Sequence, residues 1–314
     1  MKATVAEAII PDRPALKVLR DSPMSLHTTW RIGGTADFLM RAPTPADLVA
    51  AVSWGRDEGL PLTVIGGGSN LLAGDRGVRG LVVLSRTPGE RAARLVTATD
   101  EENHVLMRVG AQAPLSWVGR YACDRGWAGM DWGVGLPGTI GGATVNNAGA
   151  HGTEIKDALE SVVVIDNNGE INEFPRLWLD PRYRYTSLKA SERPRPYQVV
   201  EVVLRLPKGD PDELRRLAEE HAEYRQLTQP TGRCAGSTFT NPPGDFAGRL
   251  LEAAELKGFA VGDVAFSTKH SNFIVNGGSG TAAQVRELIA HAQAVVADRF
   301  GVHLEPEIEE IGEF

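Results

Sequence analysis

The sequence contains few cysteines and no long apolar run, and each shortage excludes a class of protein. Cys123 and Cys234 are its only cysteines, and their spacing supports neither a zinc site nor a disulfide framework. No apolar stretch of the chain reaches the roughly 20 residues that a membrane-spanning helix needs. The first ten residues also lack the apolar core of a signal peptide. We therefore expect a cytoplasmic protein that has no membrane partner.

Positive charge is also scarce. The chain has 33 Lys and Arg residues against 40 Asp and Glu residues, which gives a formal net charge of -7. This balance argues against nucleic acid as a partner, although a local basic pocket for an anionic small molecule is compatible with it. The seven histidines are scattered, and none lies beside a cysteine or a carboxylate at the spacing of metal ligands. We therefore expect no metal site.

Glycine, in contrast, is abundant, and its residues cluster in two stretches. Residues 134–152 contain six glycines separated by small residues, and residues 66–72 read Gly-Gly-Gly-Ser-Asn-Leu-Leu after the short apolar run 62–65. Successive exposed backbone N–H groups suit an anion such as a pyrophosphate. A glycine-rich surface loop is the alternative for either stretch alone, and the presence of two such stretches favours a ligand cradle.

Neither glycine stretch fits a known single-loop nucleotide motif. Residues 66–68 follow a predicted strand but lack the Gly-x-Gly-x-x-Gly register of a Rossmann turn, and no P-loop pattern occurs in the chain. The remaining interpretation is a large dinucleotide held by loops from two subdomains. A flavin dinucleotide fits this interpretation.

Capping and turn signals outline the remaining elements. Thr44-Pro45 begins a helix that Gly59 ends, and Thr281 with Gln284 forms a capping box for a helix over 281–300. Asp-Asn-Asn-Gly at 166–169 separates two apolar runs and predicts a hairpin. Residues 1 to about 22 look like a loosely ordered lead-in, and the polar residues 86–103 look like a connection with short strand pieces. The whole pattern predicts an α+β protein, with a strand-rich body and then a smaller domain.

Four further stretches contain residue types that carry chemistry, and each has an ordinary structural alternative. Ser237 follows Gly236, but a loop serine usually makes a turn hydrogen bond, and the Gly-x-Ser-x-Gly nucleophile motif is absent. Tyr183-Arg184 could be exposed packing, Glu305-Pro306-Glu307 a solvated acidic segment, and Lys269-His270 a turn. From the residues alone, these alternatives stay open.

Taken in order, these stretches resemble one family, the UDP-N-acetylenolpyruvoylglucosamine reductases, which are flavoenzymes of bacterial cell-wall precursor synthesis. The resemblance covers the chain from about residue 21 to its end, and the ordered set of motifs is far more specific than any one of them. The absence of an insertion after Glu252 resembles the shorter subtype of the family. The matching stretches are 28–34 (Thr-Thr-Trp-Arg-Ile-Gly-Gly), 64–72, 135–142, 147–149, 183–184, 229–230, 236–239, 267–270, 304–307 and 311–312.

The resemblance implies a two-subdomain FAD-binding fold of the vanillyl-alcohol-oxidase/PCMH type and a smaller α+β substrate-binding domain. The implied division is a first FAD-binding subdomain at 1–85, with residues 303–314 packing back on it, a second subdomain at 86–212 and a substrate domain at 213–302. The implied cofactor is FAD and the implied reductant NADPH. The implied partner is the small molecule UDP-N-acetylglucosamine enolpyruvate, and we expect a monomer.

The resemblance also assigns roles to particular residues. Arg184 matches the arginine that stabilises charge on the enolpyruvyl carboxylate, Ser237 matches the proton donor, and Glu307 matches the catalytic glutamate; Glu305 is the less favoured acid. Tyr183, Arg225, Asn241 and Lys269 are the predicted substrate-binding residues, with Arg225 as a phosphate-binding cation. The predicted cofactor-binding residues are Ile65, Gly66, Gly67, Gly68, Ser69, Asn70 and Leu71 in the first loop, and Gly135, Pro137, Gly138, Thr139, Gly141, Gly142, Ala143, Asn147 and Gly149 in the second stretch.

Two residues depart from the family pattern. Thr186 stands where the family usually has serine in Tyr-Arg-x-Ser, and His151 replaces a frequent tyrosine. Two other functions stay open: a flavin-dependent oxidase of the same fold that reacts with oxygen, and a non-catalytic flavin-binding module. The module would keep both glycine loops, but it would have no reason to keep Arg184, Ser237 and Glu307.

Overall fold

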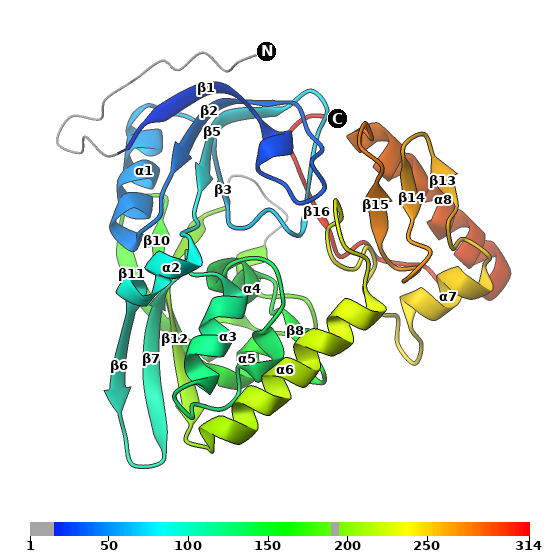
Figure 1. Cartoon of the computed structure of the whole chain (residues 1–314). Helices are drawn as coiled ribbons and strands as arrows, with labels where there is room; N and C mark the ends of the chain where they lie inside the picture. The colour runs from blue at the N-terminus through cyan, green and yellow to red at the C-terminus, as the bar shows by residue number, and fades with distance from the viewer. Residues whose placement is uncertain (1–15, 190–194) are drawn as a thin grey trace.

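The chain folds around three β-sheets that follow one another along the sequence. The computed structural model describes residues 16–189 and 195–314. The first two sheets and their helices form one body, and the third sheet lies beside it with two helices of its own (Figure 1). Helices and strands are mixed throughout, so the predicted α+β class is confirmed.

The first sheet combines one antiparallel pair with two parallel pairs. Its strand order is β1 (Val18–Pro23), β2 (Thr35–Arg41), β5 (Val78–Leu84) and β3 (Leu62–Ile65). β1 runs antiparallel to β2, whereas β2 and β3 both run parallel to β5. Helix α1 (Pro45–Asp57) supplies the crossover between β2 and β3, and its apolar face packs on β5.

The expected lead-in over residues 1–22 was wrong in its final part, because β1 is a regular strand. Val18 pairs with Met40 of β2 and is 2% exposed, so an apolar contact far along the chain fixes this segment. Residues 1–15 lie outside the described residues. The predicted boundaries of α1 are confirmed: Thr44 accepts a hydrogen bond from the backbone N–H of Asp47, and Gly59 has a φ of 64°.

The second sheet is fully antiparallel. Its order is β11 (Ile171–Pro175), β10 (Leu159–Asp166), β12 (Tyr197–Pro207), β7 (His104–Gly110) and β6 (Val96–Asp100). The turn between β10 and β11 is the hairpin that the sequence predicts. The edge strand β6 was predicted only as strand pieces, because four of its five residues are exposed and show no alternation.

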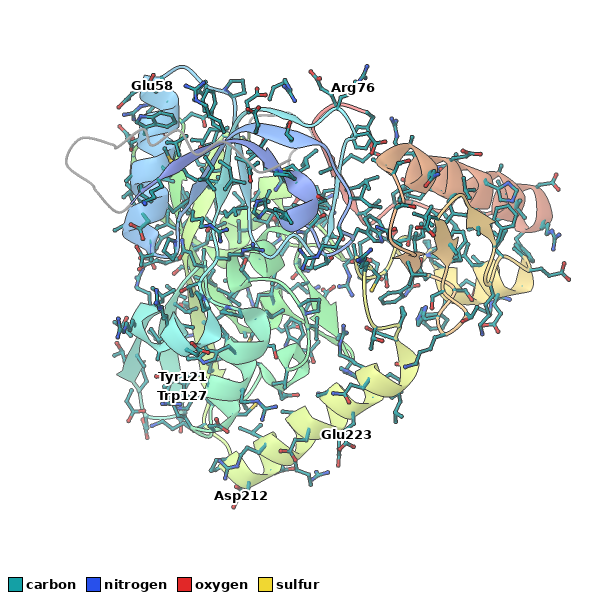
Figure 2. The ribbon with its side chains drawn as sticks, turned by 45° about the horizontal axis from the view of Figure 1, so that its top comes forward. Glu58, Arg76, Tyr121, Trp127, Asp212 and Glu223 are labelled. Atoms are coloured by element: carbon teal, nitrogen blue, oxygen red, sulfur yellow. The ribbon has the colours of Figure 1, made fainter. Side chains whose placement is uncertain are left out.

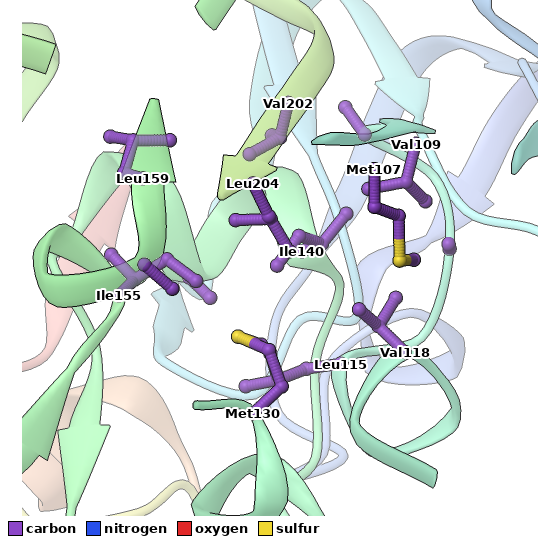
Figure 3. Packing of buried hydrophobic residues seen from close by; sticks show 14 of the residues in the cluster. Met107, Val109, Leu115, Val118, Met130, Ile140, Ile155, Leu159, Val202 and Leu204 are labelled. Atoms are coloured by element: carbon purple, nitrogen blue, oxygen red, sulfur yellow. The ribbon is translucent and has the colours of Figure 1, made fainter. Parts of the chain in front are cut away.

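Three helices cover one face of the second sheet and enclose the largest hydrophobic cluster. They are α3 (Leu115–Cys123), α4 (Ile140–Val145) and α5 (Ile155–Ala158). Each contributes side chains that point toward strands β7, β10 and β12 (Figure 3). The second glycine stretch leads into α4, and just before this helix it contacts Gly66 and Gly67, which directly follow β3. The residues labelled in Figure 3 are Met107, Val109, Leu115, Val118, Met130, Ile140, Ile155, Leu159, Val202 and Leu204.

Helix α6 (Pro211–Thr228) connects the second sheet to the third part of the molecule. Its buried residues Leu214 and Ala218 pack against Cys123 and Val134, so the first half of the helix is attached to α3. Asp212 lies at the end of α6 remote from the third part, and Glu223 points away from the body (Figure 2). The expected domain boundary near residue 213 stays a prediction.

The third part is a small α+β unit. Strands β13 (Ala260–Val261), β14 (Val264–Phe266) and β15 (Ile274–Asn276) form an antiparallel sheet, and helices α7 (Ala247–Ala253) and α8 (Ala282–Phe300) pack on it. The predicted capping box of α8 is confirmed by reciprocal hydrogen bonds between Thr281 and Gln284, and Gly301 ends the helix in the left-handed region.

After α8 the chain returns to the body formed by the first two sheets. Strand β16 (Glu309–Ile311) pairs in parallel with β4 (Leu71–Ala73), which directly follows the first glycine loop (Figure 1). Asn70 stabilises the same contact between the two segments, because its side-chain amide donates to the carbonyl oxygen of Glu307 at 3.1 Å. A segment late in the sequence therefore forms a wall beside an early loop.

Candidate active site

The two glycine loops press directly against each other. A Cβ atom added to Gly67 would lie 2.7 Å from the Cα of Gly138, and one added to Gly66 would lie 2.3 Å from Oγ1 of Thr139. Real Cβ atoms do not approach other atoms so closely, so only glycine allows this contact between the backbones. The loops face a common cavity of about 260 Å³.

The cavity gathers most of the residues that the sequence singles out. Its wall contains the three predicted catalytic residues Arg184, Ser237 and Glu307, and also Arg225. From the predicted cofactor set it contains Ile65, Gly66, Gly67, Gly68, Ser69, Asn70, Leu71, Pro137, Gly138, Thr139, Gly141, Gly142, Ala143 and Gly149.

Gly135 and Asn147 do not line the cavity; instead, each packs or forms hydrogen bonds with other parts of the protein beside it. Gly135, with a φ of 82°, lies against α6, where an added Cβ would be 3.5 Å from Ala222. Asn147 is fully buried, and its side chain donates to the carbonyl oxygen of Arg182 at 2.8 Å and accepts from the backbone of Lys156 at 3.1 Å.

Three predicted substrate-binding residues also lie outside the cavity wall. Tyr183 is 48% exposed, and its ring stacks on the guanidinium of Arg184. Asn241 accepts a hydrogen bond from the backbone of Ala247 at 3.1 Å, at the beginning of α7. Lys269 donates to the carbonyl oxygen of Gln226 at 2.5 Å, near the end of α6. All three side chains therefore have partners within the protein.

Arg184 is held from three sides. Its Nε lies 3.1 Å from Oε1 of Glu307, its Nη1 lies 3.3 Å from Oε1 of Glu154, and its Nη2 donates to the carbonyl oxygen of Gly149 at 2.8 Å. Its backbone has a φ of 56°, a conformation that is costly for a side-chain-bearing residue and is often found at functional sites. The guanidinium is thus fixed in one place at the cavity wall.

Glu307 lies in a poorly hydrated environment. Burial raises the pKa of its carboxyl group, while the positive charges of Arg184 and Lys189 oppose this rise. Burial also lowers the pKa of the Lys189 ammonium, which Glu309 and Glu307 partly offset. A carboxyl group whose pKa is raised holds a proton closer to neutral pH, as acid–base chemistry requires.

Ser237 reaches the cavity from an extended segment that runs beside Glu307. The backbone N–H of Glu307 donates to the carbonyl oxygen of Thr238 at 2.8 Å, and Phe239 forms an isolated bridge with Pro306. The side chain of Asn272 binds both backbone groups of Phe239 and fixes this segment. Ser237 and Glu307 therefore line the same cavity from neighbouring extended segments, together with Arg184 from the loop between β11 and β12.

Arg184 and Arg195 of the cavity wall form ion pairs with glutamates, whereas Arg225 forms none with any described residue. It lies in the last turn of α6, and burial lowers the pKa of its guanidinium. Within residues 16–189 and 195–314, no side-chain hydrogen bond or ion pair satisfies it. A half-buried guanidinium without a partner favours an anionic ligand.

The two departures from the family pattern have defined contacts. Thr186 is buried and donates from its hydroxyl to the carbonyl oxygen of Val145 at 2.6 Å, so it holds the end of α4. The His151 ring stacks on His221 of α6, with the ring centroids 3.9 Å apart, and thereby joins the second glycine stretch to this helix. The pKa of His151 is lowered by burial, and further by His221 and Arg225.

Sequence reasoning missed several polar residues of the wall, chiefly at the beginning of β12. Arg195 pairs with Glu309, and its Nε is buried without a hydrogen-bond partner; Oδ1 of Asn146 in the second glycine stretch is likewise unpartnered. The apolar run 198–206, bounded by Pro196 and Pro207, predicts a strand, but it does not reveal that the beginning of this strand reaches the glycine loops. The missed lining residues include Ser85, Asn146, Arg195, Tyr197, Gln198 and Glu309.

The wall fits a dinucleotide. Backbone from two glycine loops offers close approach and N–H groups for a diphosphate, and the unpartnered atoms of Arg195 and Asn146 offer further polar contacts. In the part of the chain that the structure describes, no group of three or more His, Cys, Asp or Glu side chains is arranged to hold a metal ion. None of the described helices is long and apolar enough to cross a membrane.

Comparisons with known proteins agree with this site. A profile of the C-terminal domain of UDP-N-acetylenolpyruvoylglucosamine reductase matches residues 227–311, and a profile of an FAD binding domain matches residues 36–174. The chain is 38% identical to the UDP-N-acetylenolpyruvoylglucosamine reductase of Agathobacter rectalis over all of both chains. It is 41% identical to that of Anaeromyxobacter, covering 95% of this chain and 90% of the relative.

A solved structure extends the agreement to three dimensions. The UDP-N-acetylenolpyruvylglucosamine reductase of Thermus caldophilus superposes with a TM-score of 0.76 at 33% identity, covering 94% of this chain and 99% of the other. The predicted FAD-binding fold with an additional smaller domain is thereby confirmed. The chain therefore belongs to the UDP-N-acetylenolpyruvoylglucosamine reductase family, the FAD-dependent oxidoreductases that act on a small-molecule precursor in peptidoglycan synthesis.

Proposed function

We propose that this protein uses NADPH to reduce UDP-N-acetylglucosamine enolpyruvate to UDP-N-acetylmuramate in the cavity between the glycine loops. FAD held by the residues of the two glycine loops would supply the hydride-transfer chemistry, with NADPH as the reductant and the terminal carbon of the enol ether as the acceptor. The observation that carries the proposal is the convergence of Arg184, Ser237 and Glu307 on the cavity that both glycine loops line.

Arg184 is proposed to bind the carboxylate of the enolpyruvyl group. Addition of hydride to the terminal carbon places negative charge on this carboxylate, which becomes enolate-like. A guanidinium that Glu307, Glu154 and Gly149 already hold in position needs little reorganisation to stabilise that charge. The arginine thus favours the developing charge over the neutral enol ether.

Ser237 is proposed to donate the proton to the neighbouring carbon. A serine hydroxyl is a weak acid, so it serves only when it is held close to a strongly basic carbon. Its segment is fixed by the hydrogen bonds of Thr238 and Phe239, which supports such a position. Glu307, whose raised pKa favours a bound proton, is proposed to assist in charge handling or proton supply.

Arg225 is proposed to bind the diphosphate of the substrate, because it is a half-buried cation of the cavity wall that has no partner among the described residues. Tyr183, Asn241 and Lys269 remain proposed substrate contacts, which would require each to leave its present partner. We also propose the division into residues 1–85 with 303–314, 86–212 and 213–302. A cytoplasmic monomer completes the proposal.

Absorption spectroscopy of the FAD-loaded protein tests the proposal. We expect NADPH to bleach the flavin absorbance and the enolpyruvyl sugar nucleotide to restore it without oxygen. The Ser237→Ala variant should be bleached normally by NADPH and fail to be recoloured by the sugar nucleotide, whereas Ser53→Ala in α1 should behave as the parent protein. Full turnover by Ser237→Ala would exclude serine as the proton donor.

The same experiment separates the alternatives. A flavin oxidase would be reoxidised rapidly in air without the sugar nucleotide. A non-catalytic flavin-binding module would bind FAD but show no recolouring by either acceptor. A protein that takes up no FAD on reconstitution would contradict all three functions.

A further inference from the structure

A second cleft lies on the far side of the first glycine loop. It has a volume of about 820 Å³, and its wall includes His27, Thr28, Arg31, Gly67 and Arg86. The third part of the molecule closes it through residues 232–233 and 278. Gly67 lines both this cleft and the cofactor cavity.

The charged side chains that line this cleft are all positive. Arg31 and Arg86 form no ion pair with any residue in the described ranges, and no aspartate or glutamate lines the wall. Burial lowers the pKa of the Arg86 guanidinium, and the positive charges of Arg41 and Arg31 lower it further. Arg233 differs, because it is close enough to Asp263 to help lower the pKa of that carboxyl group. Arg31 and Arg86 of the wall and Arg41 near it thus place three mutually repelling positive charges together in a protein of net charge -7.

The side chain of His27 is affected by the same excess of positive charge. It is 4% exposed, its Nε2 lies 3.0 Å from Oγ of Ser22, and its Nδ1 is buried without a hydrogen-bond partner. Burial lowers the pKa of His27 to about 4, and Arg86, Arg41 and Arg31 contribute in that order. A neutral imidazole with an unused nitrogen therefore forms part of the wall beside the arginines.

The cleft is linked mechanically to the cofactor loop. Thr29 donates from its backbone to the carbonyl oxygen of Gly68 at 3.0 Å, and a Cβ on Gly68 would lie 2.1 Å from the carbonyl oxygen of His27. Arg86 directly follows Ser85, which lines the cofactor cavity and donates from its backbone to Ile65 at 2.8 Å. A ligand in the cleft would therefore restrain the loop that faces the cofactor.

We propose that this cleft is a binding site for the phosphate group of a small molecule, held by Arg31 and Arg86. A guanidinium presents paired N–H donors that match phosphate oxygens, and a dianion offsets more of the three positive charges than a carboxylate does. The phosphate has two sources that share this chemistry: a free phosphate or pyrophosphate ion, and the 2′-phosphate of NADPH. The second source rests on the proposed function.

Binding of inorganic pyrophosphate to the FAD-loaded protein tests the site directly, at constant ionic strength with sodium chloride as the reference salt. We expect a saturable rise in melting temperature. In NMR titrations of the histidine rings, the titration midpoint of His27 should rise by roughly one unit, because an anion offsets the arginines. Arg31→Asn and Arg86→Gln should each weaken pyrophosphate binding at least roughly tenfold, since each removes a charged hydrogen-bond donor. Asparagine is chosen at position 31 because it tolerates the φ of 60° found there.

Arg91→Gln in the short helix α2 (Gly89–Ala92) is the matched control, because Arg91 is exposed and does not line the cleft. Pyrophosphate binding that does not saturate, or that is unchanged in both cleft variants, would overturn the proposal. The KM values for the two reductants identify the source of the phosphate. If Arg86→Gln raises the KM for NADPH but not for NADH, the site binds the 2′-phosphate. If the KM for NADPH is the same in Arg86→Gln as in the parent protein, the site binds a free ion. The pyrophosphate measurements need no turnover, so they stand even if the proposed reaction fails.

Discussion

At the scale of single residues, Arg184 is the side chain whose placement says most about the chemistry. Three different partners fix it: the carboxylates of Glu307 and Glu154 and the backbone carbonyl of Gly149. A flexible ammonium could keep the charge at this position but not all of these contacts. The role of the residue therefore depends on geometry as much as on charge.

The Arg184→Lys variant separates these two contributions. We expect kcat for the enolpyruvyl substrate to fall by about 10²–10³, the usual cost of losing a donor that stabilises developing charge. Reduction of FAD by NADPH should change little, because no carboxylate is involved in that step. Rapid mixing of each half-reaction measures both rates, with Arg182→Lys, an exposed neighbour, as the control. A loss confined to the NADPH step would contradict the assignment.

At the scale of elements, the contact between the two glycine loops is the feature that the fold least tolerates changing. Replacing Gly67 by alanine would place a methyl group 2.7 Å from the backbone of Gly138, so one loop must move. Both loops line the cofactor cavity. A movement of either loop should therefore affect cofactor binding before it affects the sheets.

We expect Gly67→Ala to bind FAD at least roughly tenfold more weakly, which corresponds to a loss of about 1.4 kcal/mol. Flavin fluorescence on titration of the apoprotein measures this affinity. Gly89→Ala in α2 is the control, because an added methyl group there has only ordinary contacts, the nearest at 3.5 Å. Unchanged FAD affinity in Gly67→Ala would show that the loops do not hold the cofactor.

The elements also show what local sequence determines. Helix α1 and helix α8 were predicted at their observed places, because their caps are formed by residues next to them in the chain. Strands β1 and β16 were not predicted. β1 gains its place by pairing with the next strand, β2, and the three-residue β16 by pairing with β4, far earlier in the sequence.

The sequence predicts the candidate site only in part, as it does the helices and strands. The glycine loops and the motifs around Arg184, Ser237 and Glu307 are local patterns, and the structure brings them to one cavity. The inward position of Arg195 and the outward position of Tyr183 depend on how the beginning of β12 and the segment before Arg184 pack. No periodicity in the sequence reports that packing.

At the scale of the whole molecule, buried His27 makes stability depend on pH. Its pKa is about 4 in the folded protein and near 6.5 in the unfolded chain, so below pH 6.5 the unfolded chain binds the extra proton. Acidification from pH 6.5 to about 4 should therefore lower the free energy of unfolding, by up to about 3 kcal/mol from this residue.

The His27→Asn variant should lose less stability over this pH range than the parent protein. Urea unfolding at pH 7.5 and pH 4.5 measures the difference. His303→Gln, at an exposed position, is the control and should follow the parent protein. Equal losses in His27→Asn and the parent protein would show that His27 is protonated without cost in the folded state.

The return of the chain after α8 to the first glycine loop has a consequence for biosynthesis. Asn70 and Glu307 are 237 positions apart, and translation at about 5–20 residues per second separates their appearance by ten seconds or more. Once residue 152 has been made, a nascent chain has both glycine loops but neither β16 nor the Glu307 carboxylate. Ribosome-bound chains that end before residue 304 thus carry a cofactor cleft with one wall missing, and the acid enters the site only after both loops, Arg184 and Ser237 have been made.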